Sequence, residues 1–272
     1  MVNGYVAYSL ADALKKRAEE AIIPYGGGTD LMVEEEKGRN FLFLSKSPEL
    51  KIVEAEGSYL KLGAANTFTE LIENEKVPQI LKDAMSQIAA PAIRNAGTIG
   101  GNIGNGSSKA DSALVFWATD SLLKIASVRG ERMLPINEFY KGRKELDLAD
   151  DEIIVEVHIP LKGIDNYYFE KTGARNALAI SRVSFAGIMD IEDGVIKHTA
   201  TAFGAVTPAV VRPKEADAIL IGKTIDEAKA LKEDYLKAID ESILPTRGRI
   251  SAEYRKDVCL NMVRAFLDKF GI

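Results

Sequence analysis

The spacing of apolar residues predicts an alternation of helices and strands up to residue 160. Leu10, Ala13 and Leu14 fall on one side of a helix that Ser9 can cap, and Thr67 with Glu70 has the spacing of a capping box at the start of another helix. Short apolar runs bounded by polar or glycine residues predict strands. By these criteria we expect helices at 8–20, 66–75 and 79–89, strands at 21–25, 40–46 and 151–160, a hairpin at 51–64 that turns at 56–58, and a helix leading into a strand at 112–127.

The pattern changes after residue 160. The composition turns polar over 161–166, which predicts a domain boundary there. Beyond it we expect antiparallel strands, with a hairpin turn at Asp193–Gly194, and then helices that cover one face of their sheet. The predicted strands are 167–173, 180–191 and 195–206, and the predicted helices are 212–222, 224–242 and 251–270.

Composition narrows the classes of function. The chain has 272 residues, 46% of them hydrophobic, and a formal net charge of −5. It lacks the basic footprint of a nucleic-acid-binding protein. No apolar run is long enough to span a membrane, and the first twenty residues do not read as a secretory signal. We therefore expect a cytoplasmic protein without a nucleic-acid partner.

Residues that ligate metals are scarce. Cys259 is the one cysteine, which rules out an internal disulfide and a four-thiolate iron–sulfur cluster held by this chain alone. The two histidines, His158 and His198, lie far apart in the sequence, on predicted strands. We expect no metal site in this chain, and neither histidine is expected to act as a catalytic base.

Two glycine-rich segments call for an explanation, "GGGTD" at 26–30 and "TIGGN" at 98–102. Glycine lets backbone N–H groups approach an anion without a Cβ in the way, and two such segments together suit a diphosphate. For each segment taken alone we favour a structural explanation, a tight turn for the first and a crossing between a helix and a strand for the second. Neither fits the P-loop or the Rossmann fingerprint, so a dinucleotide here would be held on another fold.

The order of the motifs identifies a family. "IPYGGGTDL", "PAIRNAGTIGGNIGNGSSKADSAL", "DEIIVEVHIP", "YYFEKTGARNALAISRVSFA" and "RGRISAEYR" follow one another as in the FAD-binding medium subunit of molybdenum hydroxylases, the xanthine, carbon monoxide and nicotinate dehydrogenase type. The resemblance covers nearly the whole chain. It implies an α+β fold: a two-lobed FAD-binding domain of the vanillyl-alcohol-oxidase-like (PCMH) type at 1–162, with lobes of about 1–55 and 56–162, and a C-terminal domain at 163–272 with an antiparallel sheet and helices.

The resemblance also implies which residues bind the cofactor. Both glycine segments would contact the FAD diphosphate, Asp111 would lie near the ribose, and Ile154 and Lys171 would lie near the flavin ring. From the sequence alone, Asp111 also suits a helix N-cap, and Lys171 suits an exposed position on a strand. The implied FAD contacts are Pro24, Tyr25, Gly26, Gly27, Gly28, Thr29, Asp30, Leu31, Thr98, Ile99, Gly100, Gly101, Asn102, Asp111, Ile154 and Lys171.

The function implied by the resemblance is electron transfer within a complex. A large subunit would carry the molybdenum cofactor, and a small subunit with [2Fe–2S] clusters would pass electrons to FAD on this chain. The final acceptor would be NAD⁺ or another oxidant, and this chain would hold no catalytic residue of its own. Two alternatives remain open at the level of sequence: a stand-alone flavoprotein reductase or oxidase on the same fold, and a binding or assembly protein that has lost FAD.

Overall fold

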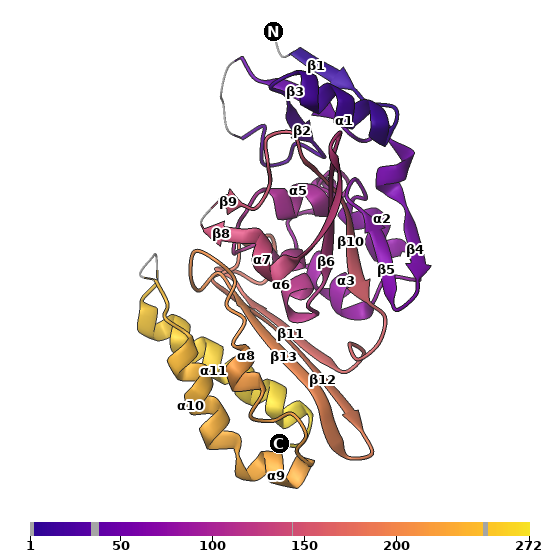
Figure 1. Ribbon diagram of the computed structural model, residues 1–272. Coiled ribbons are helices and arrows are strands. Elements are labelled where there is room, and N and C mark those ends of the chain that lie inside the picture. Colours follow the sequence, from indigo (N-terminus) through magenta and orange to yellow (C-terminus); the bar gives the residue numbers. More distant parts are fainter. Residues whose placement is uncertain (1–2, 34–37, 143, 247–249) are drawn as a thin grey trace. The chain divides into compact units, whose positions relative to one another are not determined.

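The chain divides into two compact units (Figure 1). The computed structural model describes residues 3–33, 38–142, 144–246 and 250–272. Part of the sequence motif at 247–255 therefore lies outside the described residues. Unit 1 comprises residues 1–77, 89–106 and 120–159, and unit 2 comprises residues 78–88, 107–119 and 160–272.

Unit 1 contains a small parallel sheet with the strand order β1-β3-β2. The helix that follows β1 begins as predicted, because the Ser9 hydroxyl accepts a hydrogen bond from the Asp12 amide at 3.1 Å. Its apolar side packs with Leu42 and Leu44 in the core of this sheet. The elements are β1 (Asn3–Val6), α1 (Leu10–Glu19), β2 (Ile23–Tyr25) and β3 (Asn40–Phe43).

A five-stranded sheet, in the order β4-β5-β10-β6-β7, forms the rest of the framework of unit 1. The predicted hairpin is confirmed, since Glu56 pairs with Tyr59 across a two-residue turn. Leu60, Leu62 and Val157 on its strands are fully or almost fully buried. Its strands are β4 (Val53–Glu56), β5 (Tyr59–Gly63), β6 (Leu122–Ser127), β7 (Gly130–Pro135) and β10 (Ile153–Pro160), and the smaller neighbouring elements are η1 (Pro48–Lys51), α7 (Ile136–Phe139), β8 (Tyr140–Gly142) and β9 (Glu145–Leu146).

Three short helices connect these strands: α2 (Phe68–Glu73), α4 (Pro91–Arg94) and α5 (Ile99–Gly104). The capping box predicted from Thr67 and Glu70 is confirmed at the start of α2. The sequence prediction of a glycine-rich loop over 98–102 is wrong in one respect, because α5 begins inside it. The Thr98 hydroxyl caps this helix by accepting from the Gly101 amide at 3.1 Å, which overrides the poor helix propensity of glycine.

Unit 2 is built on the antiparallel sheet β11-β12-β13, and its hairpin turns at Asp193–Gly194 as predicted. One face carries Phe185, whose ring centroid lies 5.2 Å from that of Phe203 on the neighbouring strand and 5.6 Å from that of Phe266 on the long C-terminal helix. The strands are β11 (Tyr167–Thr172), β12 (Val183–Glu192) and β13 (Val195–Gly204), and the helices that follow are α8 (Lys214–Asp217), α9 (Ile225–Ala230), α10 (Lys232–Ser242) and α11 (Ala252–Lys269).

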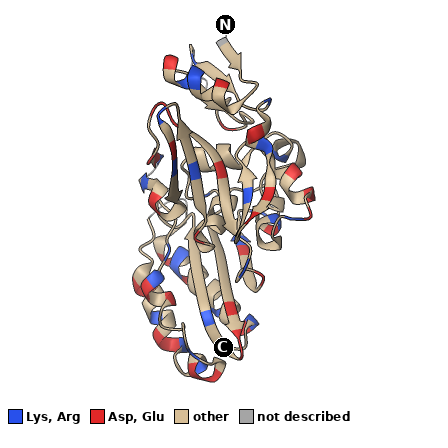
Figure 2. Ribbon diagram, turned by 45° about the vertical axis from the view of Figure 1, so that its right-hand side comes forward, with Lys and Arg blue, Asp and Glu red and all other residues tan. Residues whose placement is uncertain are grey.

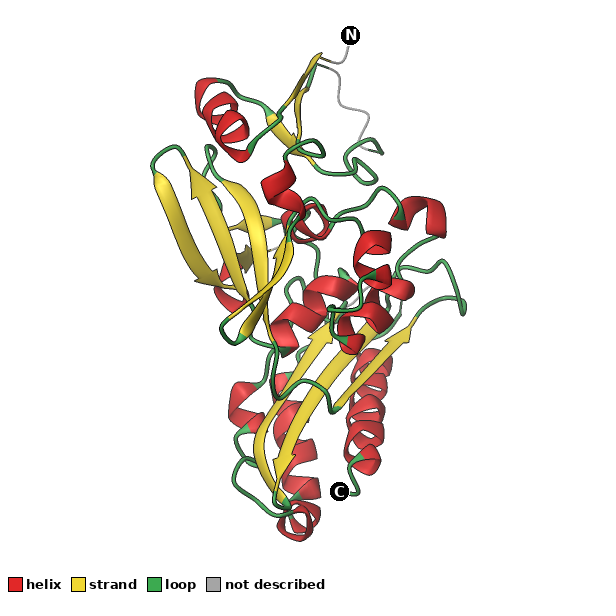
Figure 3. Cartoon of the chain, turned by 90° about the vertical axis from the view of Figure 1, so that its right-hand side faces the viewer, coloured by secondary structure: helices red, strands yellow, loops and turns green. Residues whose placement is uncertain are grey.

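The expectation that helices cover only one face of this sheet is wrong (Figure 3). Helices α3 (Gln79–Ser86) and α6 (Asp111–Ala118) come from earlier in the sequence and pack with the sheet on its other side. Leu114 of α6 lies 3.6 Å from the position that a Cβ on Gly204 would take. Every residue of α6 is buried, as expected of a helix that is apolar on all sides. Local sequence patterns cannot reveal such a long-range insertion.

Charged residues of both signs are interspersed along α9, α10 and α11 rather than gathered by sign (Figure 2). Within the described part of the chain, no helix combines the length and the apolar character that a membrane span requires.

A buried polar cluster fixes α8 and α10 to the sheet of unit 2. The Asp217 carboxylate accepts from the Thr201 amide at 2.9 Å, the Thr201 hydroxyl at 2.8 Å, the Tyr235 hydroxyl at 3.0 Å and the Arg212 guanidinium. Asp217 is 1% exposed and Tyr235 is fully buried. A buried carboxylate is tolerated when it is paired and hydrogen-bonded in this way, so we assign this cluster a structural role.

Tyr235→Phe should lower the free energy of unfolding by about 1–3 kcal/mol, because it removes one donor from a buried carboxylate. Urea unfolding of the full chain measures the effect. Tyr254→Phe, at a half-exposed position on α11, is the matched control and should change the stability by less than about 0.5 kcal/mol. Equal stabilities of the two variants would contradict a role for the Tyr235 hydroxyl.

Candidate functional site

The two glycine-rich segments, distant in sequence, come into direct contact in unit 1. A Cβ added to Gly27 would overlap the carbonyl oxygen of Ala96, and a Cβ added to Gly26 would overlap the Thr98 hydroxyl. Real Cβ atoms do not approach other atoms so closely, so only glycine fits at these two positions. The structure therefore brings together the two segments that the sequence analysis predicted to act jointly.

The first segment is anchored to the parallel sheet through Tyr25. The Tyr25 ring packs against Phe41 and Phe43 of β3, with centroids 5.5 and 4.7 Å away. Gly28 turns the chain back over this ring with a φ of +68°, a conformation that favours glycine, and a Cβ there would strike Tyr25. Among the described residues, the amides of Gly26 and Gly27 have no acceptor within the protein, which leaves both N–H groups for a ligand.

Four amides of the second segment have partners within the protein. Ile99 N donates to Asn66 O at 3.2 Å, Gly100 N to Ala64 O at 2.9 Å, and Asn102 N to Thr98 O at 2.9 Å, while the Gly101 amide donates to the Thr98 hydroxyl. The amides of residues 99–102 are therefore already used, and this segment offers the pocket its backbone shape and the Thr98 side chain.

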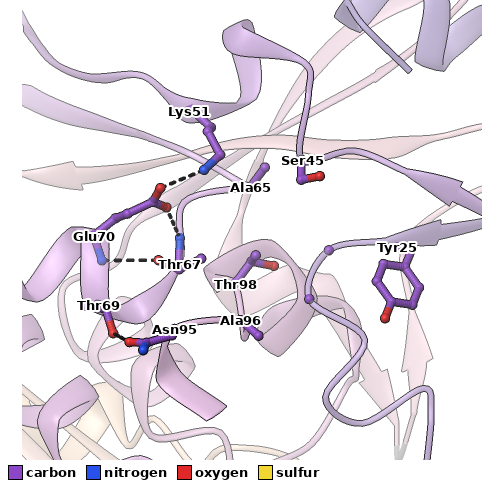
Figure 4. Close-up of a pocket in the computed structure, with 12 residues that line it drawn as sticks. Tyr25, Ser45, Lys51, Ala65, Thr67, Thr69, Glu70, Asn95, Ala96 and Thr98 are labelled. Carbon is purple, nitrogen blue, oxygen red and sulfur yellow. Dashed lines mark hydrogen bonds and ion pairs between the residues drawn. The ribbon is translucent and has the colours of Figure 1, made fainter. Parts of the chain in front are cut away.

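A pocket of about 570 Å³ opens where the two segments meet (Figure 4). Hydroxyl, amide and charged side chains surround it, together with the bare backbone of Gly26 and Gly27. It is lined by Tyr25, Gly26, Gly27, Ser45, Lys51, Ala65, Thr67, Thr69, Glu70, Asn95, Ala96 and Thr98. Such a mixture of backbone donors and neutral polar groups suits a nucleotide.

Four lining side chains form hydrogen-bonded pairs at the edge of the pocket (Figure 4). Lys51 Nζ lies 2.7 Å from Glu70 Oε1, and the Thr69 hydroxyl lies 2.6 Å from Asn95 Oδ1. Burial acts to raise the pKa of Glu70, but the hydrogen bonds from Lys51 and Thr67 outweigh it and lower that pKa below its ordinary value. The sequence analysis used Thr67 and Glu70 only as a helix start and missed Ser45, Lys51, Thr69 and Asn95, which carry no motif of their own.

The remaining residues of the first predicted segment flank the glycines. Pro24 lies in β2, and Thr29, Asp30 and Leu31 form the turns that follow, with Asp30 exposed. Ile154 lies in β10 of the same unit, buried and facing α5, with its Cδ1 3.8 Å from the Cβ position of Gly104. Direct contact of these residues with FAD stays a prediction.

Asp111 and Lys171, the other two predicted contacts, meet in unit 2. Lys171 Nζ lies 2.6 Å from Asp111 Oδ2 and 2.9 Å from the carbonyl oxygen of Gln87, and Asp111 Oδ1 accepts from the Ser181 hydroxyl at 2.6 Å. Asp111 is the first residue of α6 rather than its N-cap, and Lys171 is not on the exposed face of its strand. Gln87 and Ser181 carry no signal in the sequence, because only the fold brings Gln87 to Lys171 and Ser181 to Asp111.

No group of three or more His, Cys, Asp or Glu side chains in the described ranges is arranged to hold a metal ion. Cys259 is buried in α11, and burial raises the pKa of its thiol to about 12. This thiol is therefore an unreactive part of the core of unit 2.

Gly27→Ala should lower the free energy of unfolding by about 1–3 kcal/mol, because the new Cβ must push the 26–30 segment away from Ala96. Gly104→Ala is the control, since its Cβ would meet only Ile154 at an ordinary 3.8 Å, and it should be neutral or slightly stabilising. Chemical denaturation compares the two. A Gly27→Ala protein as stable as the wild type would contradict the close packing of the two segments.

Comparison with known proteins finds a family match for each of two parts of the chain. Residues 1–162 match the family described as "FAD binding domain in molybdopterin dehydrogenase", and residues 167–270 match the "CO dehydrogenase flavoprotein C-terminal domain". The chain is 33% identical to the xanthine dehydrogenase FAD-binding subunit of Escherichia coli O157:H7, with 97% of this chain and 94% of that protein covered. It is 30% identical to the nicotinate dehydrogenase FAD-subunit of Eubacterium barkeri, with 85% and 82% covered.

The fold is also that of a solved structure. Carbon monoxide dehydrogenase from Hydrogenophaga pseudoflava contains a chain that superposes with a TM-score of 0.90 at 24% identity, covering 98% of this chain and 96% of that one. At 24% identity this structural match shows the fold alone, and membership of the family rests on the sequence matches. The chain belongs to the FAD-binding subunits of the molybdenum hydroxylase family, whose members are oxidoreductases of the xanthine dehydrogenase type.

Proposed function

We propose that this chain holds FAD with the diphosphate against Gly26, Gly27 and Thr98, as the redox subunit of a molybdenum hydroxylase complex. The observation that carries the proposal is the contact between the two glycine segments. The N–H groups of Gly26 and Gly27 have no acceptor among the residues that the structure describes, and they lie beside a polar pocket of about 570 Å³. Backbone amides of this kind bind phosphate without needing a basic side chain.

The other lining groups would recognise the nucleotide half of the cofactor. Ser45, Thr67 and Thr69 offer hydroxyls, and Asn95 offers an amide that suits the edge of a base or the hydroxyls of a ribose. Lys51 carries a positive charge that Glu70 already balances, so the pocket gains hydrogen bonds without a strong net charge. These donors, together with the amides of Gly26 and Gly27, would suit FAD, whose two phosphates are linked.

Two further residues would serve the flavin end of the cofactor. Ile154 would exclude water from the ring, and Lys171 would place a positive charge near the flavin N1 and C2 carbonyl, where charge develops on reduction. When bound, FAD would accept electrons from the [2Fe–2S] clusters of a small partner subunit and deliver them to NAD⁺ or another acceptor. The chain's own residues would bind, orient and shield the cofactor, while a large subunit with the molybdenum cofactor would carry the substrate.

Two further expectations from the sequence belong with this proposal. The FAD-binding domain would end near residue 162 and the C-terminal domain would begin at 163, in agreement with the family matches that end at 162 and begin at 167. The cytoplasmic location also stays a prediction.

FAD titration of the purified full chain tests the proposal, with bound flavin followed by its visible absorbance and identified after denaturation. Thr98→Val should weaken FAD binding about 10- to 100-fold, because it removes the hydroxyl that faces Gly26 and caps α5. Thr98→Ser keeps that hydroxyl and should bind nearly as well as the wild type. Circular dichroism should show that both variants are folded.

A wild-type chain that binds no flavin, alone or with its partner subunits present, would refute the proposed function. Equal FAD affinities of Thr98→Val and Thr98→Ser would instead refute the placement of the diphosphate.

A further inference from the structure

Unit 2 contains a buried cation, the ammonium group of Lys171. The side chain of Lys171 leaves β11 and is 6% exposed. It is held from two other segments, by the carbonyl oxygen of Gln87 at the end of α3 and by the carboxylate of Asp111 at the start of α6. Burying an ammonium group costs several kcal/mol before its partners compensate, and an apolar side chain would often serve the stability as well or better. A buried lysine held in this way is therefore a candidate for function.

One carboxylate oxygen of Asp111 forms an ion pair with Lys171. Its two carboxylate oxygens are divided, with Oδ2 at 2.6 Å from Lys171 Nζ and Oδ1 at 2.6 Å from the Ser181 hydroxyl. The side chain is 4% exposed. Burial raises the pKa of Asp111, although the charge and hydrogen bond of Lys171 and the hydrogen bond from Ser181 oppose this shift. Ser181 thus orients the carboxylate, and the carboxylate orients the ammonium group.

The cluster of Asp111, Lys171 and Ser181 differs from the cluster around Asp217 in how many of its hydrogen-bonding groups have partners among the described residues. The Asp217 carboxylate receives four donors from the protein. At Asp111 the carboxylate receives two donors, and the ammonium group of Lys171 has two acceptors among the described residues for its three N–H bonds. One N–H of Lys171 is left for an acceptor that the protein does not supply, such as a ring carbonyl or nitrogen.

We propose that Asp111 and Ser181 are positioning residues that act through Lys171. They fix its direction and balance part of its charge, and so set how strongly this chain favours reduced over oxidised flavin. This inference rests on the proposed function, because Lys171 must lie beside the bound ring. It differs from a direct contact between Asp111 and the cofactor, in which Lys171 would be irrelevant to the effect of Asp111.

A double-mutant cycle on the FAD-loaded full chain separates these possibilities. The quantity measured is the ratio of the affinities for reduced and oxidised FAD, obtained from the midpoint potential against reference dyes. Lys171→Met should lower this ratio about tenfold, because it removes a positive charge near the developing negative charge. Asp111→Asn should raise it, by about five- to tenfold, because the charge of Lys171 is then no longer balanced.

The opposite signs are the signature of the proposal, because general damage to the site would move both variants the same way. Once Lys171 is methionine, adding Asp111→Asn should change the ratio by less than about twofold. Ser181→Ala should shift the ratio in the direction of Asp111→Asn but less, since Asp111 keeps its charge and loses one of its two hydrogen bonds.

Tyr235→Phe is the matched control for Ser181→Ala. Each variant removes a hydroxyl that donates to a buried, cation-paired aspartate in unit 2. Ser181 donates to Asp111, whereas Tyr235 donates to Asp217. Tyr235→Phe should leave the flavin ratio unchanged within about twofold while lowering stability as described above.

Two results would overturn the inference while leaving FAD binding intact. An undiminished effect of Asp111→Asn in the Lys171→Met background would show that Asp111 acts on the cofactor directly. A shift for Asp111→Asn of the same sign as for Lys171→Met, or no larger than for Tyr235→Phe, would show that it does not balance the charge of Lys171. A wild-type chain that never binds FAD would overturn the proposed function itself, and this inference with it.

Discussion

The contact between the backbone of Gly27 and the carbonyl of Ala96 is the constraint on which the site depends. It requires that a segment after β2 and a segment before α5 approach more closely than any side chain allows. Tyr25, packed on β3, holds the first segment, and the bonds of α5 to Asn66 and Ala64 hold the second. Packing thus requires the glycines, and the same close approach places the amides of Gly26 and Gly27, which have no acceptor among the described residues, beside the pocket.

Buried charge is used in two ways in unit 2. The carboxylate of Asp217 receives four hydrogen bonds, two from Thr201 and one each from Tyr235 and Arg212. The pair of Asp111 and Lys171 is equally buried but leaves one donor of the ammonium group unused. Because the two clusters lie in the same unit, each serves as an internal control for the other when stability is to be separated from an effect on the cofactor.

Sequence reasoning succeeded where structure follows from local chemistry and failed where distant segments decide it. The cap at Ser9, the capping box at Thr67 and the hairpin turn at Gly194 depend on a few neighbouring residues, and all three were predicted. Helix α5 was missed because its glycines disfavour a helix, which forms around the Thr98 cap and tertiary bonds. Gln87, a partner of Lys171, and Ser181, a partner of Asp111, were missed because no local pattern relates such distant residues.

A crystal structure of the full chain with FAD tests the central claim most directly. The account predicts diphosphate oxygens within about 3.2 Å of the amide nitrogens of Gly26 and Gly27, with the contact between Gly27 and Ala96 unchanged. A diphosphate bound elsewhere, with the two glycine segments still packed together and their amides facing water, would contradict it and leave the glycines with a purely structural role.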